Sequence, residues 1–476
     1  MKRITAYFLA ICSLVVFVFA GCENSQNVLP QDPTLLISDT DHSDQSDPIS
    51  EPSSSENSSD SSTGEESGDS SVPVEEPPKK KDEPKYVEFF REKAVHTLSI
   101  EIKSADWEAI CENPLKKDYH PADITIDGKT ISQCGFKTHG NSTLQAAIDR
   151  EVTLFPFKIK FDKYTDEKFL GLDELVLCNN ILDNSYARQY AGYEAFHAIG
   201  KDAPYCTFFS VYINGERFGL YAGVEDVDSS YLKRVFGNKK NNLYKMNNSA
   251  TLMSNMPSWA VSQKKGEDTS KSDLKLLVKT LKEMPLGEKG NIEEILDVDS
   301  ALAYLAVGAV IHHCDGYAGY SANNYCLYFD GNVFHMIPWD MDLCFYQTGW
   351  GFLPSKGSRM DIKSGLTDTA TLSERPLVQK LLAVDEYYAT YLEYCKQTAK
   401  WLKEFSESGV DELYSLLDET VKKDPKNNYY VFKGEYDSSE LKSFAGYIKD
   451  RAAYLEKRIP EVYKEKGMDY YQSLYM

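Results

Sequence analysis

The stretch SALAYLAVGAVIHHCDGYAGYSANNYCLYFDGNVFHMIPWDMDLCFY, residues 300–346, decides the fold prediction. Its first part, 301–312, is almost wholly apolar and predicts a buried helix. Two strand-like runs, 325–329 and 332–337, follow on either side of Asp330-Gly331. Asp-Gly between two such runs indicates a hairpin, because both central positions of the turn favour φ > 0. The stretch therefore predicts a helix, a loop and a β-hairpin.

Polar side chains gather at the open end of this predicted hairpin. We expect Phe329 to face Asn332 across the turn, which puts Asn324 opposite Ile337. The open end then holds amide and carboxylate groups from Asn323, Asn324, Asp340, Asp342 and, from the preceding loop, Asp315. Oxygen ligands of this kind are those that Mg²⁺ or Mn²⁺ favours.

Length and composition describe a folded protein. The chain has 476 residues, 42% of them hydrophobic, and 32 are Tyr. Its net charge of −21 argues against nucleic-acid binding, which needs a positive face. No nucleic-acid partner is therefore expected.

Residues 1–22 form a predicted targeting segment. Lys2 and Arg3 precede an apolar run, and Ala20-Gly21-Cys22 resembles a bacterial lipobox, although Phe19 stands where Leu is usual. This predicts a bacterial lipoprotein, cleaved before Cys22, lipidated on its sulfur and held at the outer side of the cell membrane; simple secretion is the alternative. No other apolar run approaches the length that spans a bilayer.

Residues 23–85 are predicted to be a disordered linker. Ser, Asp, Glu and Pro dominate, aromatics are absent, and 16 acidic residues stand against 4 basic ones. Such a composition buries too little apolar surface to offset the entropy of ordering. The eight cysteines beyond the targeting segment show no CxxC pair or zinc spacing, and we assign no disulfide.

The part from 86 to 476 is predicted to be α+β. Strand-like runs and hairpin signals at Asp127-Gly128 and Asn214-Gly215 come first, and helical periodicity at 377–402, 409–422 and 438–457 comes last. The sequence thus predicts a β-rich part followed by an α-rich part, with the central hairpin in the second half.

The order of polar residues around the central hairpin follows that of a protein kinase. Kinases place a catalytic Asp after a helix, then an Asn, and a metal-binding Asp farther on. Asp315, Asn324 and Asp340 have this order, although Asn324 comes nine positions after Asp315 instead of about five. Asp342, two positions after Asp340, would point to the same side of an extended chain. The alternative is that both carboxylates cap a loop or bind structural Ca²⁺.

Several motifs resemble those of the CotH kinase family, the spore coat protein H-like atypical protein kinases. They are HHCDGY (312–317), NNYCLY (323–328), IPWDMD (337–342), GFKTHGNS (135–142), YINGERFGLY (212–221) and NLYK (242–245). The resemblance implies an atypical kinase fold and transfer of the ATP γ-phosphate to Ser or Thr of a protein, with Mg²⁺ or Mn²⁺. It implies that Asp315 is the catalytic Asp and that Asn324 and Asp340 hold metal.

The nucleotide-binding side chains are less defined. Lys158 and Lys160 share one face of a predicted strand, and Lys245 lies in the NLYK motif; any of them could contact ATP, and a solvated strand face is the alternative. Glu225 could be an ion-pair or hinge carboxylate, or a surface charge. Arg188, shortly after Asp183, could contact phosphate or make an internal ion pair.

Other chemistries lack their motifs. The sequence has no GxSxG, HExxH or P-loop pattern. The alternative to a kinase is a non-catalytic cell-surface adhesion or scaffold protein that retains a kinase-like fold, because ATP is scarce outside the cell.

Overall fold

The computed structural model describes residues 83–183, 185–345, 357–366, 370–422 and 438–464. From Pro84 on, these residues belong to one structural unit. The predicted targeting segment, Cys22 and nearly all of the predicted linker lie outside the described residues. Among the described residues, the longest helices are too polar to cross a bilayer.

Seven strands of the first half close into a barrel in the order β1-β2-β3-β4-β5-β7-β6. Neighbouring strands are antiparallel, except that β1 and β6 close the barrel in parallel, with Val95 paired to Phe208. Alternate apolar side chains such as Leu98 and Ile100 fill its interior. The strands are β1 (Val95–Ile102), β2 (His120–Ile126), β3 (Lys129–Thr138), β4 (Phe157–Lys160), β5 (Glu174–Cys178), β6 (Cys206–Ile213) and β7 (Glu216–Glu225).

Two barrel hairpins confirm the turn predictions. Ile126 pairs with Lys129 around Asp127 and Gly128, whose φ angles are 46° and 82°. The β6–β7 hairpin turns at Asn214 and Gly215, with φ angles of 50° and 80°. Both positions of each turn are left-handed, as a type I′ turn requires.

A second sheet has the order β11-β10-β8-β9. It comprises β8 (Leu243–Met246), β9 (Val261–Lys265), β10 (Tyr325–Phe329) and β11 (Phe334–Pro338). The β9 strand was not predicted from the sequence. Two consecutive lysines, Lys264 and Lys265, interrupt the alternation of apolar and polar residues that would indicate a strand. Charged side chains are common on edge strands such as this one.

The central hairpin forms, but its predicted register is wrong. Phe329 pairs with Phe334, not Asn332, so four residues make the turn. The Asp330 carboxylate accepts hydrogen bonds from the backbone N–H groups of Asn332 and Val333, which favours this wider turn over a two-residue one. Because the shift is two residues, each side chain keeps its predicted face. Asn324 now lies next to Trp339, whose N–H donates to its carbonyl over 3.3 Å.

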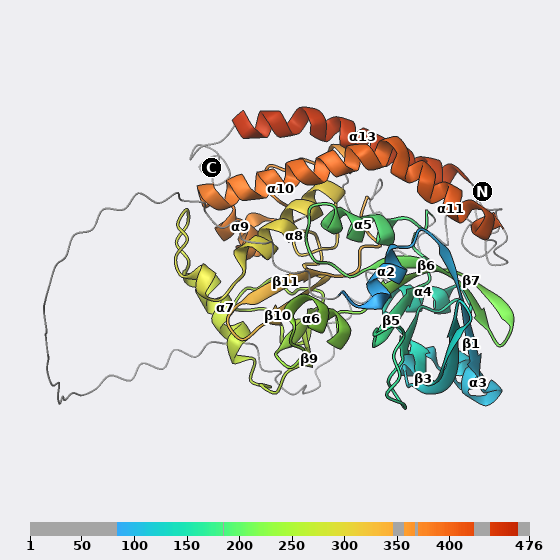
Figure 1. Ribbon diagram of the computed structural model, residues 1–476. Coiled ribbons are helices and arrows are strands. Elements are labelled where there is room, and N and C mark those ends of the chain that lie inside the picture. Colours follow the sequence, from blue (N-terminus) through green and yellow to red (C-terminus); the bar gives the residue numbers. More distant parts are fainter. Residues whose placement is uncertain (1–82, 184, 346–356, 367–369, 423–437, 465–476) are drawn as a thin grey trace, which may run out of the picture. The chain divides into compact units, whose positions relative to one another are not determined.

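Helices pack around both sheets (Figure 1). α8 (Val298–Ile311) is apolar on all sides and almost completely buried, as a central helix should be. The others are α2 (Lys85–Arg91), α3 (Ser104–Glu112), α4 (Ser142–Asp149), α5 (Arg188–His197), α6 (Ser229–Phe236), α7 (Ser272–Glu283), α9 (Pro376–Leu381), α10 (Asp385–Glu404), α11 (Val410–Lys422) and α13 (Ser438–Lys464).

The α+β class is confirmed, with the barrel first and the longest helices last. One predicted helix, 377–402, is two helices. α9 ends at Leu381 and α10 begins at Asp385, where Asp385 and Glu386 stabilise a new helix N-terminus. In Figure 1, α8 and α10 run beside each other over the second sheet, and α13 packs against α10.

Candidate active site

The end of α8 and the start of β10 bring Asp315 and Asn324 together. α8 ends at Ile311, and the next residue, His312, turns the chain out of the helix with a φ of 53°. The loop then folds back, and the Asn324 side-chain amide donates to Asp315 Oδ2 over 2.6 Å. Gly316 permits this tight loop, since a Cβ there would lie 2.7 Å from His313 Nδ1 and 3.0 Å from the Tyr304 hydroxyl. Two side chains predicted to share a site therefore touch.

His313 ties this loop to the segment after β11. Its Nε2 lies 3.2 Å from the Asp340 carbonyl oxygen and also 3.2 Å from Asp315 Oδ1. The contact with the carbonyl is a hydrogen bond, whereas the contact with Asp315 Oδ1 is an ion pair only if His313 is protonated. Asp315 Oδ1 is thus buried without a hydrogen-bond partner among the described residues. Such an orphaned acceptor is costly unless a ligand or water satisfies it.

Burial and the charge of Asp315 raise the pKa of both Asp340 and Asp342. Burial raises the pKa of Asp340, and the charge of Asp315 raises it further, while Lys245 and His313 oppose the shift. Burial also raises the pKa of Asp342 well above its usual range, with Asp340, Asp315 and Asp183 adding to the effect. The three carboxylates therefore repel one another at this spot.

A divalent cation would relieve that repulsion. Within the described part of the chain, no group of three or more His, Cys, Asp or Glu side chains is arranged to hold a metal ion as it stands. The donor set nevertheless has the right chemistry, because Asp315, Asn324, Asp340 and Asp342 all carry hard side-chain oxygens and Asp315 Oδ1 lacks a hydrogen-bond partner among the described residues. The residues present fit Mg²⁺ or Mn²⁺ by type and charge.

Arg188, at the start of α5, borders the carboxylates. Its guanidinium bonds Asp183 over 2.8 Å, the internal ion pair that the sequence left as one alternative. It also lowers the pKa of Asp342, so it lies within electrostatic reach of the site. Asn184 lies outside the described residues.

Lys158 and Lys160 face two acids of the barrel. Lys158 pairs with Glu174 on β5 and with Asp226 just after β7. Burial lowers the pKa of Lys158, but the attraction of Asp226 and Glu174 outweighs it and raises the pKa overall. Lys160 lies 2.7 Å from Glu174 and 3.1 Å from Asp162. The alternative that Lys158 lies on a solvated strand face is therefore wrong, because its side chain is only 15% exposed.

Lys245 contrasts with these two lysines. It lies on β8 opposite Cys326 of β10, and its Nζ is 5.2 Å from the centre of the Trp339 ring. Among the described residues it has no carboxylate within ion-pair distance, yet it lowers the pKa of Asp340. Its charge also lowers the pKa of Lys117, His139 and Lys264 after the effect of burial. Lys245 thus belongs with Lys117 and Lys264 to a basic group of lysines whose charges act on one another, whereas the lowered pKa of His139 favours its neutral ring.

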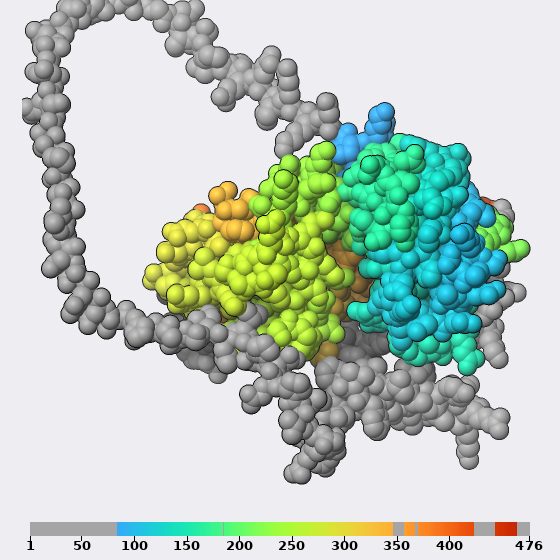
Figure 2. Space-filling view, turned by 90° about the horizontal axis from the view of Figure 1, so that it is seen from below, coloured from blue at the N-terminus to red at the C-terminus, as the bar shows by residue number. Residues whose placement is uncertain are grey.

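The lysines of this basic group come from both halves of the described chain. Lys117 comes from the barrel half, and Lys245 and Lys264 come from the second sheet. Figure 2 shows a hollow between the cyan barrel strands and the yellow-green region that contains β8, β9 and α7. Positive charge between low-dielectric walls attracts anions such as phosphates.

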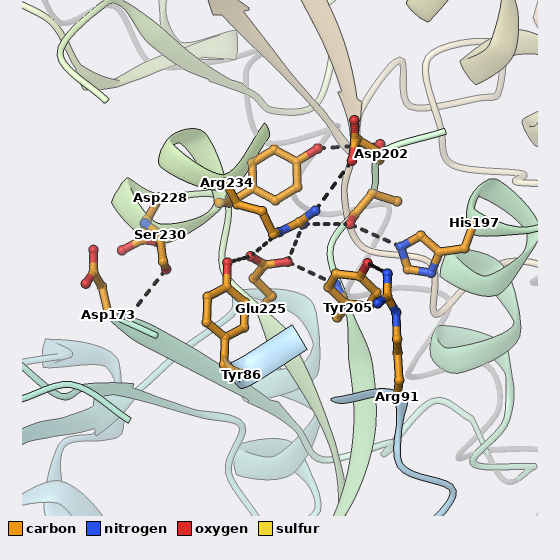
Figure 3. A network of polar contacts seen from close by, with 12 residues as sticks. Tyr86, Arg91, Asp173, His197, Asp202, Tyr205, Glu225, Asp228, Ser230 and Arg234 are labelled. Atoms are coloured by element: carbon orange, nitrogen blue, oxygen red, sulfur yellow. Dashed lines mark hydrogen bonds and ion pairs between the residues drawn. The ribbon is translucent and has the colours of Figure 1, made fainter. Parts of the chain in front are cut away.

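Glu225 has a different environment from the one expected of a nucleotide contact. It is fully buried, so the surface-charge alternative is wrong. Its carboxylate pairs with Arg234 Nη2 over 2.7 Å and accepts a hydrogen bond from the Tyr86 hydroxyl over 2.6 Å. Figure 3 shows Arg234 and Tyr86 converging on Glu225, with Tyr205 beside them. Glu225 joins α2, β7 and α6, and no lysine of the described part of the chain pairs with it.

The sequence did not single out three residues of this region. Asp226 and Glu174 hold Lys158, and His313 joins the loops of Asp315 and Asp340. Asp226 directly follows Glu225, and His313 precedes Asp315 by two, so proximity in sequence was the available signal. The pairing of β4 with β5, which brings Glu174 to Lys158, had no such signal.

The eight described cysteines are all free, which agrees with the absence of an assigned disulfide. Burial raises the pKa of Cys314 and Cys344, which flank the carboxylates. These thiols are therefore protonated and behave as small apolar side chains.

Comparisons with known proteins found a family, a curated relative and a solved structure. Residues 136–455 match the family described as CotH kinase protein. The inner spore coat protein H of Bacillus subtilis (strain 168) is 26% identical over 313 residues, covering 62% of this chain and 81% of that protein. A structure of the Shewanella oneidensis MR-1 toxin–antitoxin system HipA, HipB and its operator DNA covers 78% of this chain and 75% of its own, at 11% identity and a TM-score of 0.35.

Proposed function

Because the chain belongs to the CotH kinase protein family, we propose that it is a protein kinase that transfers the γ-phosphate of ATP to a Ser or Thr hydroxyl of a protein. The observation that carries this proposal is the hydrogen bonding of the Asp315 carboxylate. Its Oδ2 is held by Asn324 over 2.6 Å, while its buried Oδ1 has no hydrogen-bond partner among the described residues. A carboxylate fixed at one oxygen and open at the other suits the orientation of an acceptor hydroxyl.

In this proposal Asp315 Oδ1 accepts the hydrogen bond of the Ser or Thr hydroxyl and takes its proton as the oxygen attacks the γ-phosphorus. The bond from that phosphorus to the bridging oxygen breaks, and ADP leaves with that oxygen. Asn324, Asp340 and Asp342 are the residues that would hold Mg²⁺ or Mn²⁺. When bound, the metal neutralises charge on the phosphate oxygens. His313 keeps the two loops together through the Asp340 carbonyl.

Lys245 is the residue that we assign to the phosphates of ATP. It lies within electrostatic reach of Asp340, lacks a carboxylate partner among the described residues and belongs to the basic group. Lys158 and Lys160 are already paired with Glu174, Asp226 and Asp162, so a phosphate would have to compete with those acids. Lys158 and Glu225 therefore support the site from within the barrel in this assignment.

We place the activity outside the cytoplasm. The lipobox-like Ala20-Gly21-Cys22 supports a signal peptide over 1–22 and a lipid anchor on Cys22. Residues 23–85 would then link the anchor to a kinase domain over 86–476. The spore coat relative supports a surface location in general terms. ATP would have to be available in that compartment.

The direct test is phosphate transfer by the full chain. The protein is incubated with γ-labelled ATP, Mn²⁺ and a Ser-rich acceptor peptide, and the label on protein and peptide is counted. Wild type should transfer label, and Asp340→Ala should not, although it should fold. The same small background from both proteins would contradict the kinase proposal. Binding of ATP by wild type without transfer would favour a non-catalytic surface protein that keeps the fold.

A further inference from the structure

The two residues that would hold metal from opposite arms of the central hairpin share an unusual backbone conformation. Asn324 has φ = 57° and Asp340 has φ = 58°. Left-handed backbone is unfavourable for residues other than glycine and persists only where surrounding contacts enforce it. Asn in this conformation is tolerated best, and Asp less so. Contacts that hold these two backbones therefore set the positions of both side chains.

A buried hydroxyl holds the Asn324 backbone. Tyr304 is on α8 and is 2% exposed. Its hydroxyl donates to the Asn324 carbonyl oxygen over 3.2 Å. The same hydroxyl accepts a hydrogen bond from the Tyr317 N–H over 3.2 Å. One side chain thus joins both ends of the loop that carries Asp315 and Asn324.

A second buried hydroxyl holds the Asp340 backbone. Tyr193 is on α5 and has no exposed surface. Its hydroxyl accepts a hydrogen bond from the Asp340 N–H over 3.0 Å. The neighbouring Gly192 lets the helix touch this segment, because a Cβ there would lie 2.4 Å from Met341 Cβ. The contact between α5 and residues 340–341 leaves no room for the backbone to move toward the helix.

We propose that Tyr193 and Tyr304 are positioning residues that fix Asp340 and Asn324, respectively, in the geometry that binds metal. The two tyrosines come from α5 and α8, which pack against each other above the β10–β11 hairpin (Figure 1). Each acts on a backbone group and not on a carboxylate. The metal part of this inference rests on the proposed function, whereas the backbone part does not.

Other buried tyrosines provide a contrast. Tyr328 on β10 has no exposed surface, and its hydroxyl donates to the Asn238 carbonyl over 2.9 Å. Asn238 is not among the residues with positive φ and belongs to no site described above. Tyr328→Phe therefore removes the same chemical group, a tyrosine hydroxyl that donates to a backbone carbonyl, from a part-buried hydrogen bond of β10. It is the matched control for the loss of a tyrosine hydroxyl.

The test compares Tyr193→Phe, Tyr304→Phe, the double variant and Tyr328→Phe in the full chain. Amide hydrogen exchange followed by mass spectrometry reports on peptides that cover 313–324 and 338–345. Free Mn²⁺, measured by its electron paramagnetic resonance signal, reports the dissociation constant. Urea unfolding shows whether the four variants lose comparable stability.

We expect exchange to increase at the Asp340 amide in Tyr193→Phe and at the Tyr317 amide in Tyr304→Phe, because each loses its acceptor. The Mn²⁺ dissociation constant should rise about tenfold in each, the typical effect of removing a group that orients a metal ligand. Tyr328→Phe should leave both quantities unchanged. Rates and dissociation constants equal to those of Tyr328→Phe would overturn the inference.

The experiment separates this inference from the proposed function. If wild type binds no Mn²⁺ but exchange increases at the two amides, the proposed metal site fails and the backbone positioning stands. If wild type binds Mn²⁺ and neither tyrosine variant differs from the control, the metal site stands and the positioning role fails.

Discussion

Asn324 donates its side-chain amide to Asp315 Oδ2 over 2.6 Å, across nine positions of sequence. This contact joins the loop after α8 to the first residue before β10. It occupies one oxygen of the Asp315 carboxylate and leaves Oδ1 buried and without a hydrogen-bond partner among the described residues. The spacing between Asp315 and Asn324 is longer than in common kinases. The loop between them folds back, so the two side chains still touch.

The carboxylates at the site should make the metal-free protein less stable as pH rises. Burial and mutual repulsion raise the pKa of Asp340 and Asp342 in the folded chain. Between the unfolded pKa near 4 and the raised folded pKa, the unfolded chain binds fewer protons than the folded one. The free energy of unfolding therefore falls as pH rises through that window. Below the window the protein keeps its full stability.

Urea unfolding from pH 4 to 8 in EDTA measures this effect. Asp342→Asn should flatten the decline and be more stable than wild type at pH 8, whereas the exposed Asp450→Asn should follow wild type. Mn²⁺ should stabilise wild type more at pH 8 than at pH 5, because protons compete with the metal. A wild-type protein that gains stability toward pH 8 without metal would contradict the described repulsion.

Lys245 and Lys160 should differ in their effect on ATP affinity. Lys245→Met should raise the ATP dissociation constant about tenfold, since a hydrogen bond to a charged group contributes about 1.5 kcal/mol. Lys160→Met should change it less than about twofold, because Lys160 is paired with Glu174 and Asp162. Fluorescence of a labelled ATP analogue gives both constants. The reverse order would assign the phosphate contact to the barrel lysines.

Glu225 should matter for stability more than for nucleotide binding. Glu225→Gln leaves Arg234 buried without its carboxylate, and removal of one partner of a buried pair costs about 3–5 kcal/mol. Glu412→Gln breaks an exposed pair with Lys93 and should cost less than about 1 kcal/mol. Urea unfolding compares the two variants. Equal stabilities would contradict the central place of Glu225 in the network of Figure 3.

Cys22 should determine membrane attachment. Cys22→Ser removes the sulfur that carries the predicted lipid, so the protein should move from the membrane fraction to the soluble exported fraction. Cys12→Ser, inside the predicted apolar run, should stay membrane-bound. Membrane attachment that is unaffected by Cys22→Ser would exclude the lipoprotein prediction.

Local signals in the sequence predicted much of the fold. Asp127-Gly128 and Asn214-Gly215 determine their hairpins because the residue types themselves favour the required φ angles. Asp330-Gly331 carried the same signal, yet the Asp330 side chain binds two backbone N–H groups and widens the turn. Whether the turn has two or four residues depends on how β10 pairs with β8 and β11. That pairing cannot be read from the residues of the turn.

The candidate site was predictable in part for the same reason. Asp315, Asn324 and Asp340 were found because their order follows a known arrangement, and the structure brings Asp315 and Asn324 into contact. The partners of Lys158 were not predictable, because Glu174 and Asp226 reach it only through strand pairing in the barrel. Whether Asp342 and Asp340 hold metal stays a prediction.

The most direct test of the central claim is the transfer rate of Asp315→Asn. Asn keeps the size of the side chain but removes the carboxylate that would orient the acceptor hydroxyl and take its proton. With saturating ATP and Mn²⁺, single-turnover transfer to a Ser-rich peptide should fall at least about 100-fold, the typical contribution of a general base. ATP affinity should change little. Transfer by Asp315→Asn at the wild-type rate would contradict the assignment of Asp315 as the catalytic residue.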